Sequence, residues 1–335
     1  MIACYGEALV DLMVSDYSQE KLQTASQACL GGSVFNFCLA AQRQGMASVY
    51  LNALSTDVFG RQFAHVMTKE GVLLDAEAPC HEPTSIAVVQ LDATGKASYT
   101  FHRERVADTA RAADDVMSRW RADVVALHTG CLMLTPSAWP QTRQIMAHAA
   151  GLGCVVSVDA NLRPAACPDA AAYLLCVLQA CAMAHIVKVS DDDLVELGWL
   201  AAGDAFDTQA FDTQACVSAA GRFFDSSTTA LVALTLGARG AWLLTRNHRL
   251  HVAAPLDISV VDTVGAGDSF AAALLAHLHT NGVLTMAALR QGLSVTDLQA
   301  ALAHAVAAAS LCVQRTGCDP ATWAQTQAFA DGLLG

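Results

Sequence analysis

Short apolar segments that end in polar residues and are followed by helix-like stretches recur along the chain. They constrain its fold more than any other feature. The segments are 2–12, 47–57, 124–132, 154–163, 184–193 and 229–240. Strands that alternate with helices pair side by side in parallel, because each connection has to cross over one face of the sheet. We therefore predict an α/β fold with a doubly wound, mostly parallel sheet and helices on both faces.

The polar residues that end these segments predict where a ligand binds. In sheets of this kind, ligands collect outside the carboxyl ends of the strands. Those ends carry Asp11, Asp57, Gly130, Asp159, Asn161, Asp193, Thr235 and Gly237. We expect a site to be built along that edge of the sheet.

One segment breaks the alternation. Residues 84–103 are typical of two alternating strands around a turn at 92–95, with no helix between them. We predict an antiparallel hairpin that joins the strand leaving Asp11 in a small sheet, which would project from the main sheet as a lid. A tandem pentapeptide within 204–215 is interpreted as part of a surface loop.

Length and charge exclude several classes of protein. A chain of 335 residues is expected to form one large domain with an appendage. The net charge of −12 disfavours general binding to nucleic acid or anionic lipid, because that binding needs clustered Lys and Arg. Apolar runs stay below the roughly 20 residues of a membrane span, and no secretory pattern follows Met1, so we expect a cytoplasmic protein.

Cysteine and histidine spacing predicts neither disulfides nor a metal cluster. The twelve cysteines are scattered through apolar segments without a C-x-x-C pair, so we interpret them as buried free thiols. The eleven histidines show no H-E-x-x-H or paired ligand spacing.

The stretch 262–278 places two glycines and an alanine directly before Asp268, and then continues as an apolar helical pattern. Unpaired amides at the start of a helix favour an anion. Asp268 has the wrong charge for such a site, so it needs another role. The two roles open to it are a base beside the anion site and an N-cap of the helix.

Together with Gly31, Gly32 and Asn36, the stretch DTVGAGDSF resembles the signatures of the ribokinase-like (PfkB) sugar kinases. FHRERVAD, VDANLR, VKVSDDDLVEL and LTLGARGAW follow the order seen in the fructokinases of that family. The resemblance implies a ribokinase-like domain over 1–335 with a small β-sheet lid formed by about 12–30 and 84–105. It also implies transfer of the ATP γ-phosphate to a sugar hydroxyl, with fructose to fructose 6-phosphate as the first expectation.

The resemblance assigns the catalytic residues. Asp268 matches the base that accepts the hydroxyl proton, and the amides of Gly265, Ala266 and Gly267 match an anion hole. Arg163 would steady phosphate charge. These roles agree with the chemistry, because a transferring phosphoryl group needs positioning and charge stabilisation, and its acceptor must lose a proton.

The other matched positions fall into sugar-binding and nucleotide-binding sets. The sugar-binding positions are Asp11, Gly31, Gly32, Asn36, Arg103 and Asn161. The nucleotide-binding positions are Lys188, Ser190, Thr235, Gly237, Gly240 and Val306. Val34 and Phe35 replace the more common Pro and Ala of the first signature, which leaves the choice of sugar open.

The resemblance also implies metal ions. Asp193 matches a glutamate associated with Mg²⁺ in the family, and as the shorter side chain it would act through a water molecule. A monovalent cation, often K⁺ in the family, would be held near Asp262, Val264 and Gly317.

Alternative functions remain open at this point. 2-Keto-3-deoxygluconate kinase comes second, ribokinase or adenosine kinase third, and a non-catalytic sugar or nucleotide sensor last. A dinucleotide-dependent oxidoreductase is disfavoured because the first strand leads into GEALVD rather than G-x-G-x-x-G. In the family the lid often pairs with a second subunit, so we expect a homodimer.

Overall fold

The structure is a computed structural model that describes residues 1–15, 23–75, 80–91, 97–201, 212–225 and 228–334. Its larger sheet has nine strands in the order β13-β12-β11-β10-β9-β8-β1-β4-β5. These are β1 (Ile2–Tyr5), β4 (Ser48–Tyr50), β5 (Leu73–Leu74), β8 (Ala126–Gly130), β9 (Val155–Asp159), β10 (Ile186–Ser190), β11 (Leu231–Thr235), β12 (Ala241–Leu244) and β13 (Arg249–Val252). In this spatial order, all neighbouring strands from β11 through β1 to β5 pair in parallel, and β12 and β13 add an antiparallel edge. The mostly parallel sheet is thereby confirmed.

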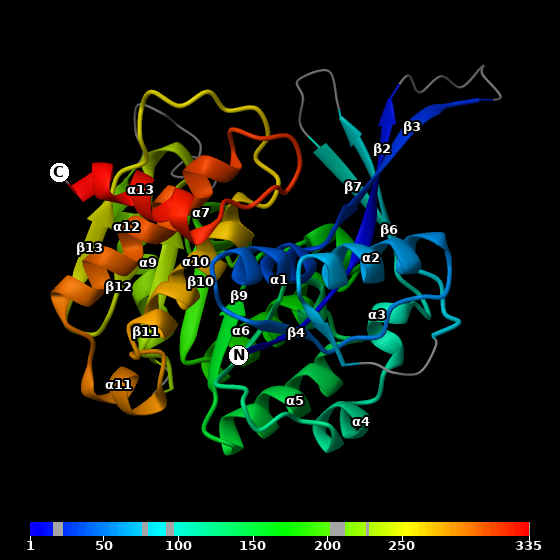
Figure 1. The fold of residues 1–335 in the computed structure, drawn as a ribbon, viewed down its shortest axis with the longest axis horizontal. Helices are drawn as coiled ribbons and strands as arrows, with labels where there is room; N and C mark the ends of the chain where they lie inside the picture. Colours follow the sequence, from blue (N-terminus) through cyan, green and yellow to red (C-terminus); the bar gives the residue numbers. More distant parts are fainter. Residues whose placement is uncertain (16–22, 76–79, 92–96, 202–211, 226–227, 335) are drawn as a thin grey trace.

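Helices cover both faces of this sheet (Figure 1). One face carries α1 (Ser33–Arg43), α2 (Val58–Lys69), α10 (Ala266–Thr280), α11 (Met286–Gln291), α12 (Val295–Cys312) and α13 (Trp323–Leu334). The other carries α4 (Ala113–Ser118), α5 (Trp139–Gly151), α6 (Ala170–Met183), α7 (Asp191–Glu196) and α9 (Thr213–Gly221). Because strand side chains alternate between faces, Ile2 and Cys4 pack into the first core while Ala3 and Tyr5 pack into the second. Strands buried on both faces explain why the sequence shows continuous apolar runs.

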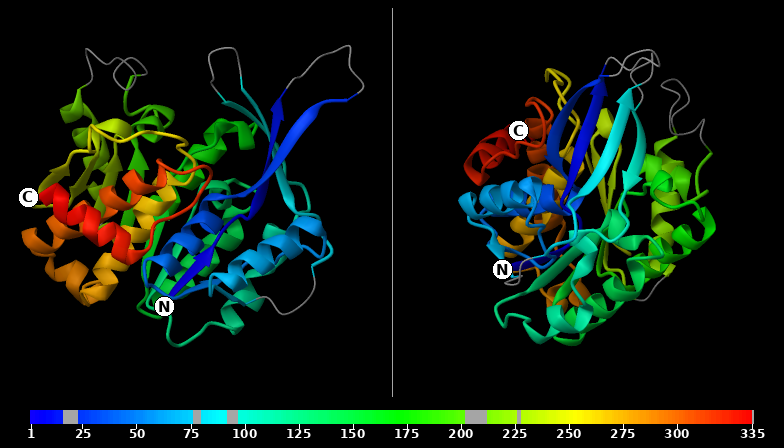
Figure 2. Two further views of the ribbon diagram at one scale, coloured as in Figure 1. Left: turned by 45° about the horizontal axis from the view of Figure 1, so that its top comes forward. Right: turned by 90° about the vertical axis from the view of Figure 1, so that its right-hand side faces the viewer.

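A second sheet of four strands projects from the main body (Figures 1 and 2). Its order is β3-β2-β6-β7, with β2 (Leu9–Ser15), β3 (Ala25–Gly31), β6 (Ser85–Leu91) and β7 (Ala97–His102). β6 and β7 form the expected antiparallel hairpin. Its turn at 92–95, and residues 204–211 of the tandem pentapeptide, lie outside the described residues. That this sheet acts as a lid, and the lid boundaries, stay predictions.

The first apolar segment differs from its sequence interpretation. The sequence predicts one strand over 2–12 that ends at Asp11. In the structure this segment forms β1 of the larger sheet and the first part of β2 of the smaller one. Asp11 therefore lies inside β2, opposite Cys29 of β3 and Ala87 of β6. The chain changes sheets at Gly6, where a Cβ atom would lie 2.1 Å from Cγ2 of Val34 on α1. The glycine lets the backbone pass directly against that helix.

The remaining elements are short or buried. A short helix, α3 (Ala107–Ala110), follows β7, and 3₁₀ turns occur at Cys131–Leu134, Pro164–Ala166, Arg222–Asp225 and Gly237–Arg239. Among the described helices, α12 alone is long and apolar enough to span a membrane, and 61% of it is buried in the protein, as in a core helix. All twelve cysteines are free and most are buried, which confirms that prediction.

The change of sheet at Gly6 can be tested by adding one methyl group. We expect Gly6→Ala to lower the free energy of unfolding by about 1–3 kcal/mol, since the new Cβ overpacks the core against Val34. Thermal and denaturant unfolding would measure this.

Gly151→Ala is the matched control, because a Cβ at Gly151 meets nothing within 4 Å. It should change stability by less than about 1 kcal/mol. A Gly6→Ala, Val34→Ala double variant should lose less stability than the sum of the single changes. Equal losses at both glycines would contradict the packing argument.

Candidate active site

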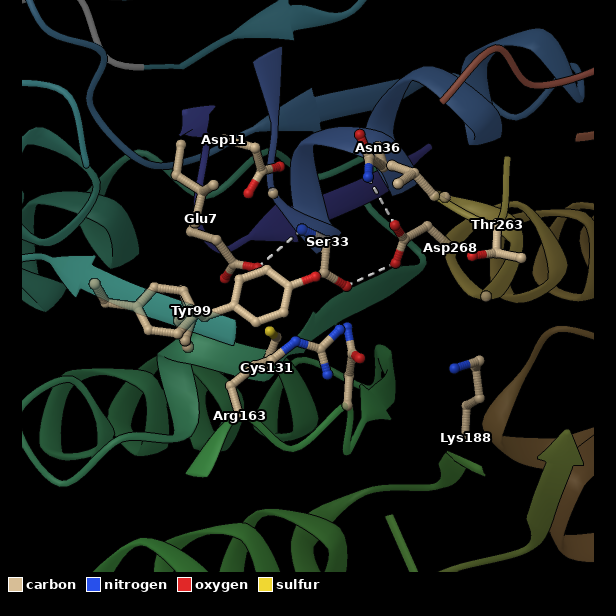
Figure 3. A pocket seen from close by; sticks show the side chains of 18 residues that line it. Glu7, Asp11, Ser33, Asn36, Tyr99, Cys131, Arg163, Lys188, Thr263 and Asp268 are labelled. Atoms are coloured by element: carbon tan, nitrogen blue, oxygen red, sulfur yellow. Dashed lines mark hydrogen bonds between the residues drawn. The ribbon is translucent and has the colours of Figure 1, made fainter. Parts of the chain in front are cut away.

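A cavity of about 280 Å³ opens where the smaller sheet meets the carboxyl ends of the central strands. Side chains from both sheets and from the N-termini of α1 and α10 line it (Figure 3). It brings together ten of the residues singled out from the sequence. They are Asp11, Gly32, Asn36, Asn161, Arg163, Lys188, Val264, Gly265, Gly267 and Asp268.

Both carboxylate oxygens of Asp268 accept hydrogen bonds from residues of α1. It lies in the first turn of α10 and is 8% exposed. Ser33 Oγ donates a hydrogen bond to its Oδ1 at 2.7 Å, and Asn36 Nδ2 donates to its Oδ2 at 2.8 Å (Figure 3). The helix N-cap is instead Gly265, and no side chain caps this end. The capping role considered for Asp268 is therefore not the one that its side chain has.

Burial raises the pKa of Asp268 above its ordinary value. The hydrogen bonds from Asn36 and Ser33 oppose this shift, as do the positive charges of Lys188 and Arg163. The net direction is upward because desolvation penalises the charged form more than these neighbours favour it. A base with a raised pKa accepts a proton more strongly than an ordinary aspartate does.

The start of α10 beside Asp268 is open for an anion. Gly265 has a φ of 76°, and a Cβ on it would lie 2.3 Å from Sγ of Cys318, so this position requires glycine. A Cβ on Gly267 would lie 3.1 Å from Nζ of Lys188. The amide of Ala266 donates to the carbonyl of Thr263 at 3.3 Å, which leaves those of Gly265 and Gly267 as the better candidates for an anion hole.

Two cationic side chains reach the cavity. Nζ of Lys188, at the end of β10, donates to both carboxylate oxygens of Asp159 at 2.9 and 3.0 Å, and the pair is buried. Arg163 donates to the carbonyl of Leu162 at 2.8 Å and lies near Tyr99 from the smaller sheet (Figure 3). Asn161 precedes it with a φ of 34°. The positive charge of Lys188 thus faces the start of α10 while Asp159 balances it.

The end of the cavity near the smaller sheet is acidic. Burial raises the pKa of Asp11 to about 6, although Arg163 opposes the shift. Gly31 and Gly32 pack tightly there, because a Cβ on Gly31 would lie 2.4 Å from Oδ2 of Asp11 and one on Gly32 would lie 2.6 Å from the carbonyl oxygen of Glu7. Gly32 lines the cavity and Gly31 supports Asp11 from behind.

Arg103 lies outside the residues that line the cavity. Its Nη2 forms an ion pair with Oδ1 of Asp108 at 3.0 Å, and its Nη1 donates to the carbonyl of Leu132 at 3.3 Å. In this arrangement Arg103 holds the wall together rather than facing a sugar. Its role as a sugar ligand stays a prediction.

The predicted nucleotide residues, apart from Lys188, lie outside this cavity. Ser190 forms a capping box with Asp193 at the start of α7. Thr235 ends β11, and Gly237 and Gly240 follow it with φ of 53° and 86°. Val306 is buried in the core on α12. Their contacts with ATP stay predictions.

Asp193 does not fit a direct metal ligand. Its carboxylate accepts hydrogen bonds from the amides of Leu162 and Ser190 and from the Ser190 hydroxyl, at 2.7 to 2.8 Å, and the residue is 4% exposed. Among the described residues, no group of three or more His, Cys, Asp or Glu could hold a metal ion. That Asp193 holds Mg²⁺ through a water molecule stays a prediction.

The residues expected near a monovalent cation do meet. The carboxylate of Asp262 accepts from the amide of Val264 at 3.0 Å and from that of Gly317 at 2.9 Å. Asp262 thereby ties the loop after α12 to the start of α10. That K⁺ binds there stays a prediction.

Sequence reasoning missed several residues of the cavity wall. Ser33 and Glu7 belong to the hydrogen-bonded network, while Tyr99, Phe101 and Cys131 complete the wall. The presence of a carboxylate in the otherwise apolar segment 2–10 was the available signal for Glu7. No comparable signal marked Ser33, whose contact with Asp268 joins residues 235 apart in the sequence.

Comparisons with known proteins agree with this arrangement. The family model for pfkB family carbohydrate kinases matches residues 1–325. The chain is 30% identical to a fructokinase of Rhizobium leguminosarum bv. trifolii, covering 85% of this chain and 82% of that protein. It is 31% identical to a fructokinase of Salmonella typhimurium, covering 89% and 91%.

Solved structures share the fold. A fructokinase from Xylella fastidiosa with bound ATP has a TM-score of 0.78 at 23% identity, covering 100% of this chain and 99% of the other. An aminoimidazole riboside kinase from Salmonella enterica has a TM-score of 0.75 at 24% identity, covering 98% and 99%. Kinases of this family use ATP and a divalent metal. The chain therefore belongs to the pfkB family of carbohydrate kinases and is an ATP-dependent sugar kinase.

Proposed function

We propose that this kinase phosphorylates fructose to fructose 6-phosphate, with Asp268 as the base. The observation that carries the proposal is the buried carboxylate of Asp268, held by Ser33 and Asn36 beside the uncapped start of α10. Relatives named fructokinase at about 30% identity support the choice of sugar.

The geometry suggests a separate role in phosphoryl transfer for the carboxylate, the backbone amides and the cationic side chains of the cavity. Ser33 and Asn36 fix the orientation of the Asp268 carboxylate, which lines the cavity. A sugar hydroxyl there would lose its proton to Asp268 as its oxygen attacks the γ-phosphorus. The amides of Gly265 and Gly267, with Lys188 and Arg163, would stabilise the charge that spreads over the phosphoryl oxygens. Mg²⁺ would enter with ATP as part of the substrate.

The charges around the cavity favour a neutral sugar over 2-keto-3-deoxygluconate. Recognition of a carboxylate is best served by a free arginine fork. Arg103 is already paired with Asp108, and we assign Arg163, the arginine that lines the cavity, to the phosphoryl charge. The wall also carries the carboxyl groups of Glu7 and Asp11. A sugar acid would meet like charges there, whereas hydroxyl groups can donate hydrogen bonds to them.

The substrate assignment is tested by a steady-state screen. We expect fructose with MgATP to give ADP release and a phosphorylated sugar, at a kcat/KM at least about 10-fold above those of ketodeoxygluconate, ribose and adenosine. Turnover with ketodeoxygluconate but not with fructose would refute the substrate and leave the kinase assignment intact.

The base assignment is tested by Asp268→Asn. An asparagine can keep both contacts, because its oxygen can accept from Asn36 while its NH₂ donates to the Ser33 hydroxyl. We therefore expect little change in melting temperature and a fall in kcat of about 10² to 10⁴-fold. In the wild type, kcat should decline as the pH falls through the raised pKa of Asp268, because only the ionised base accepts the proton.

Gly267→Val separates the anion hole from the base. Its side chain would displace Lys188, whose Nζ lies 3.1 Å from the Cβ position, and crowd the amides while Asp268 stays intact. Turnover should drop, and kcat should still decline as the pH falls, but at a higher pH, because moving the Lys188 charge away raises the pKa of Asp268 further. For the other variant, Asp268→Asn, near-normal turnover would contradict the assignment of Asp268 as the base.

We also propose that the smaller sheet acts as a lid. It contributes Tyr99 and Phe101 to the cavity wall, so its movement would open and close the site and exclude water during transfer. Separately, we propose that the protein is located in the cytoplasm.

The outer strand β3 is largely exposed, and an exposed sheet edge favours pairing with another chain. We expect a homodimer through this sheet. Sedimentation that shows only monomer at micromolar concentration would contradict it.

A further inference from the structure

Glu7 occupies an unusual position in the wall of the sugar cavity. It lines the cavity and yet is 0% exposed. Its Oε1 accepts a hydrogen bond from the amide of Ser33 at 2.9 Å (Figure 3). Its Oε2 is buried and has no hydrogen-bond partner among the described residues. A buried carboxylate oxygen without a partner is costly, so its presence beside a ligand cavity calls for a function.

The groups around Glu7 leave that oxygen unsatisfied. Arg103 contributes a positive charge, but its Nη atoms donate to Asp108 and the carbonyl of Leu132, and its Nε is buried without a hydrogen-bond partner among the described residues. Asp108 adds a negative charge, and the uncharged Tyr50 and Cys131 face Glu7 from β4 and from the turn after β8. Burial raises the pKa of Glu7 to about 7, with Arg103 opposing and Asp108 adding to the shift.

We propose that Glu7 is a sugar-binding residue, whose Oε2 accepts a hydrogen bond from a hydroxyl group of the neutral sugar. The backbone of Ser33 fixes Oε1, so the carboxylate is already oriented, and a hydroxyl group would reach Oε2 once the side chains that cover it shift. The same Ser33 donates its hydroxyl to Asp268. One residue of α1 therefore holds both the sugar-binding carboxylate and the base, which sets the position of the sugar relative to Asp268. This inference rests on the proposed function.

The proposal has a consequence for protons. A hydroxyl that donates to Oε2 stabilises the ionised form, so sugar binding lowers the pKa of Glu7 and releases its proton. At pH 7 a group with a pKa of about 7 is about half protonated in the free enzyme, while Asp11 with a pKa of about 6 is about one-tenth protonated. Binding near pH 7 should therefore release a proton from the protonated fraction of Glu7, and this release should decrease as the pH rises above the pKa of Glu7.

Calorimetric titration of fructose without ATP, in buffers of different ionisation enthalpy, measures this release directly. We expect a measurable proton release for wild type near pH 7 that falls as the pH rises, and a several-fold smaller release for Glu7→Gln, which can still accept from Ser33 but does not titrate. Asp268→Asn is the control, because it removes another buried carboxyl from the same cavity. It should retain the release.

The fructose Kd of the wild type gives a second readout that does not depend on a variant folding. It should rise towards 10-fold per pH unit below about pH 7, since protonated Glu7 cannot accept the hydroxyl. Binding without proton release, release that persists in Glu7→Gln, or release that is lost only in Asp268→Asn would overturn the role of Glu7 alone. Absence of fructose binding by the wild type would instead overturn the proposed substrate and this inference with it.

Discussion

Two hydrogen bonds to Asp268 connect parts of the chain that are far apart in sequence, and the active site depends on them. They tie the first turn of α10 to the first turn of α1, so the amides that open α10 and the backbone that follows Gly32 face one cavity. The same bonds solve a physical problem, because a buried carboxylate without donors would be strongly destabilised. The Asp268 carboxylate is thus positioned by the contacts that make its burial tolerable.

Charge balance around the cavity extends this argument. Asp159 is buried and its pKa is raised to about 6 by desolvation, with Lys188 opposing the shift. That pair holds Lys188 against Gly267, where a phosphate would need positive charge. Arg103 is held by Asp108 in the same way on the sugar side. In the function that we propose, the cations lie near the phosphate and the acids near the sugar hydroxyls, so the cavity has two ends with different chemistry.

The sequence was most informative where local pattern and global fold agree. Alternating apolar segments predicted the parallel sheet because strands buried on both faces must be apolar throughout. The stretch before α10 predicted Asp268 and its neighbouring glycines, which the structure places in one cavity. The pattern failed at Gly6, because an apolar run looks the same whether it continues in one sheet or crosses to another. It also gave no sign that Arg103 pairs with Asp108, because spacing alone does not identify such a partner.

The sequence alone determined the layers of the fold, the family and the place of Asp268 at the start of a helix, because these depend on periodicity and on residues that are neighbours in the chain. Only the tertiary structure decided which side chains share the cavity and how they titrate. Ser33 reaches Asp268 across 235 positions, and Glu7 is isolated from water by residues of both sheets. Burial and hydrogen bonding over such separations follow from packing in three dimensions, which a one-dimensional pattern does not encode.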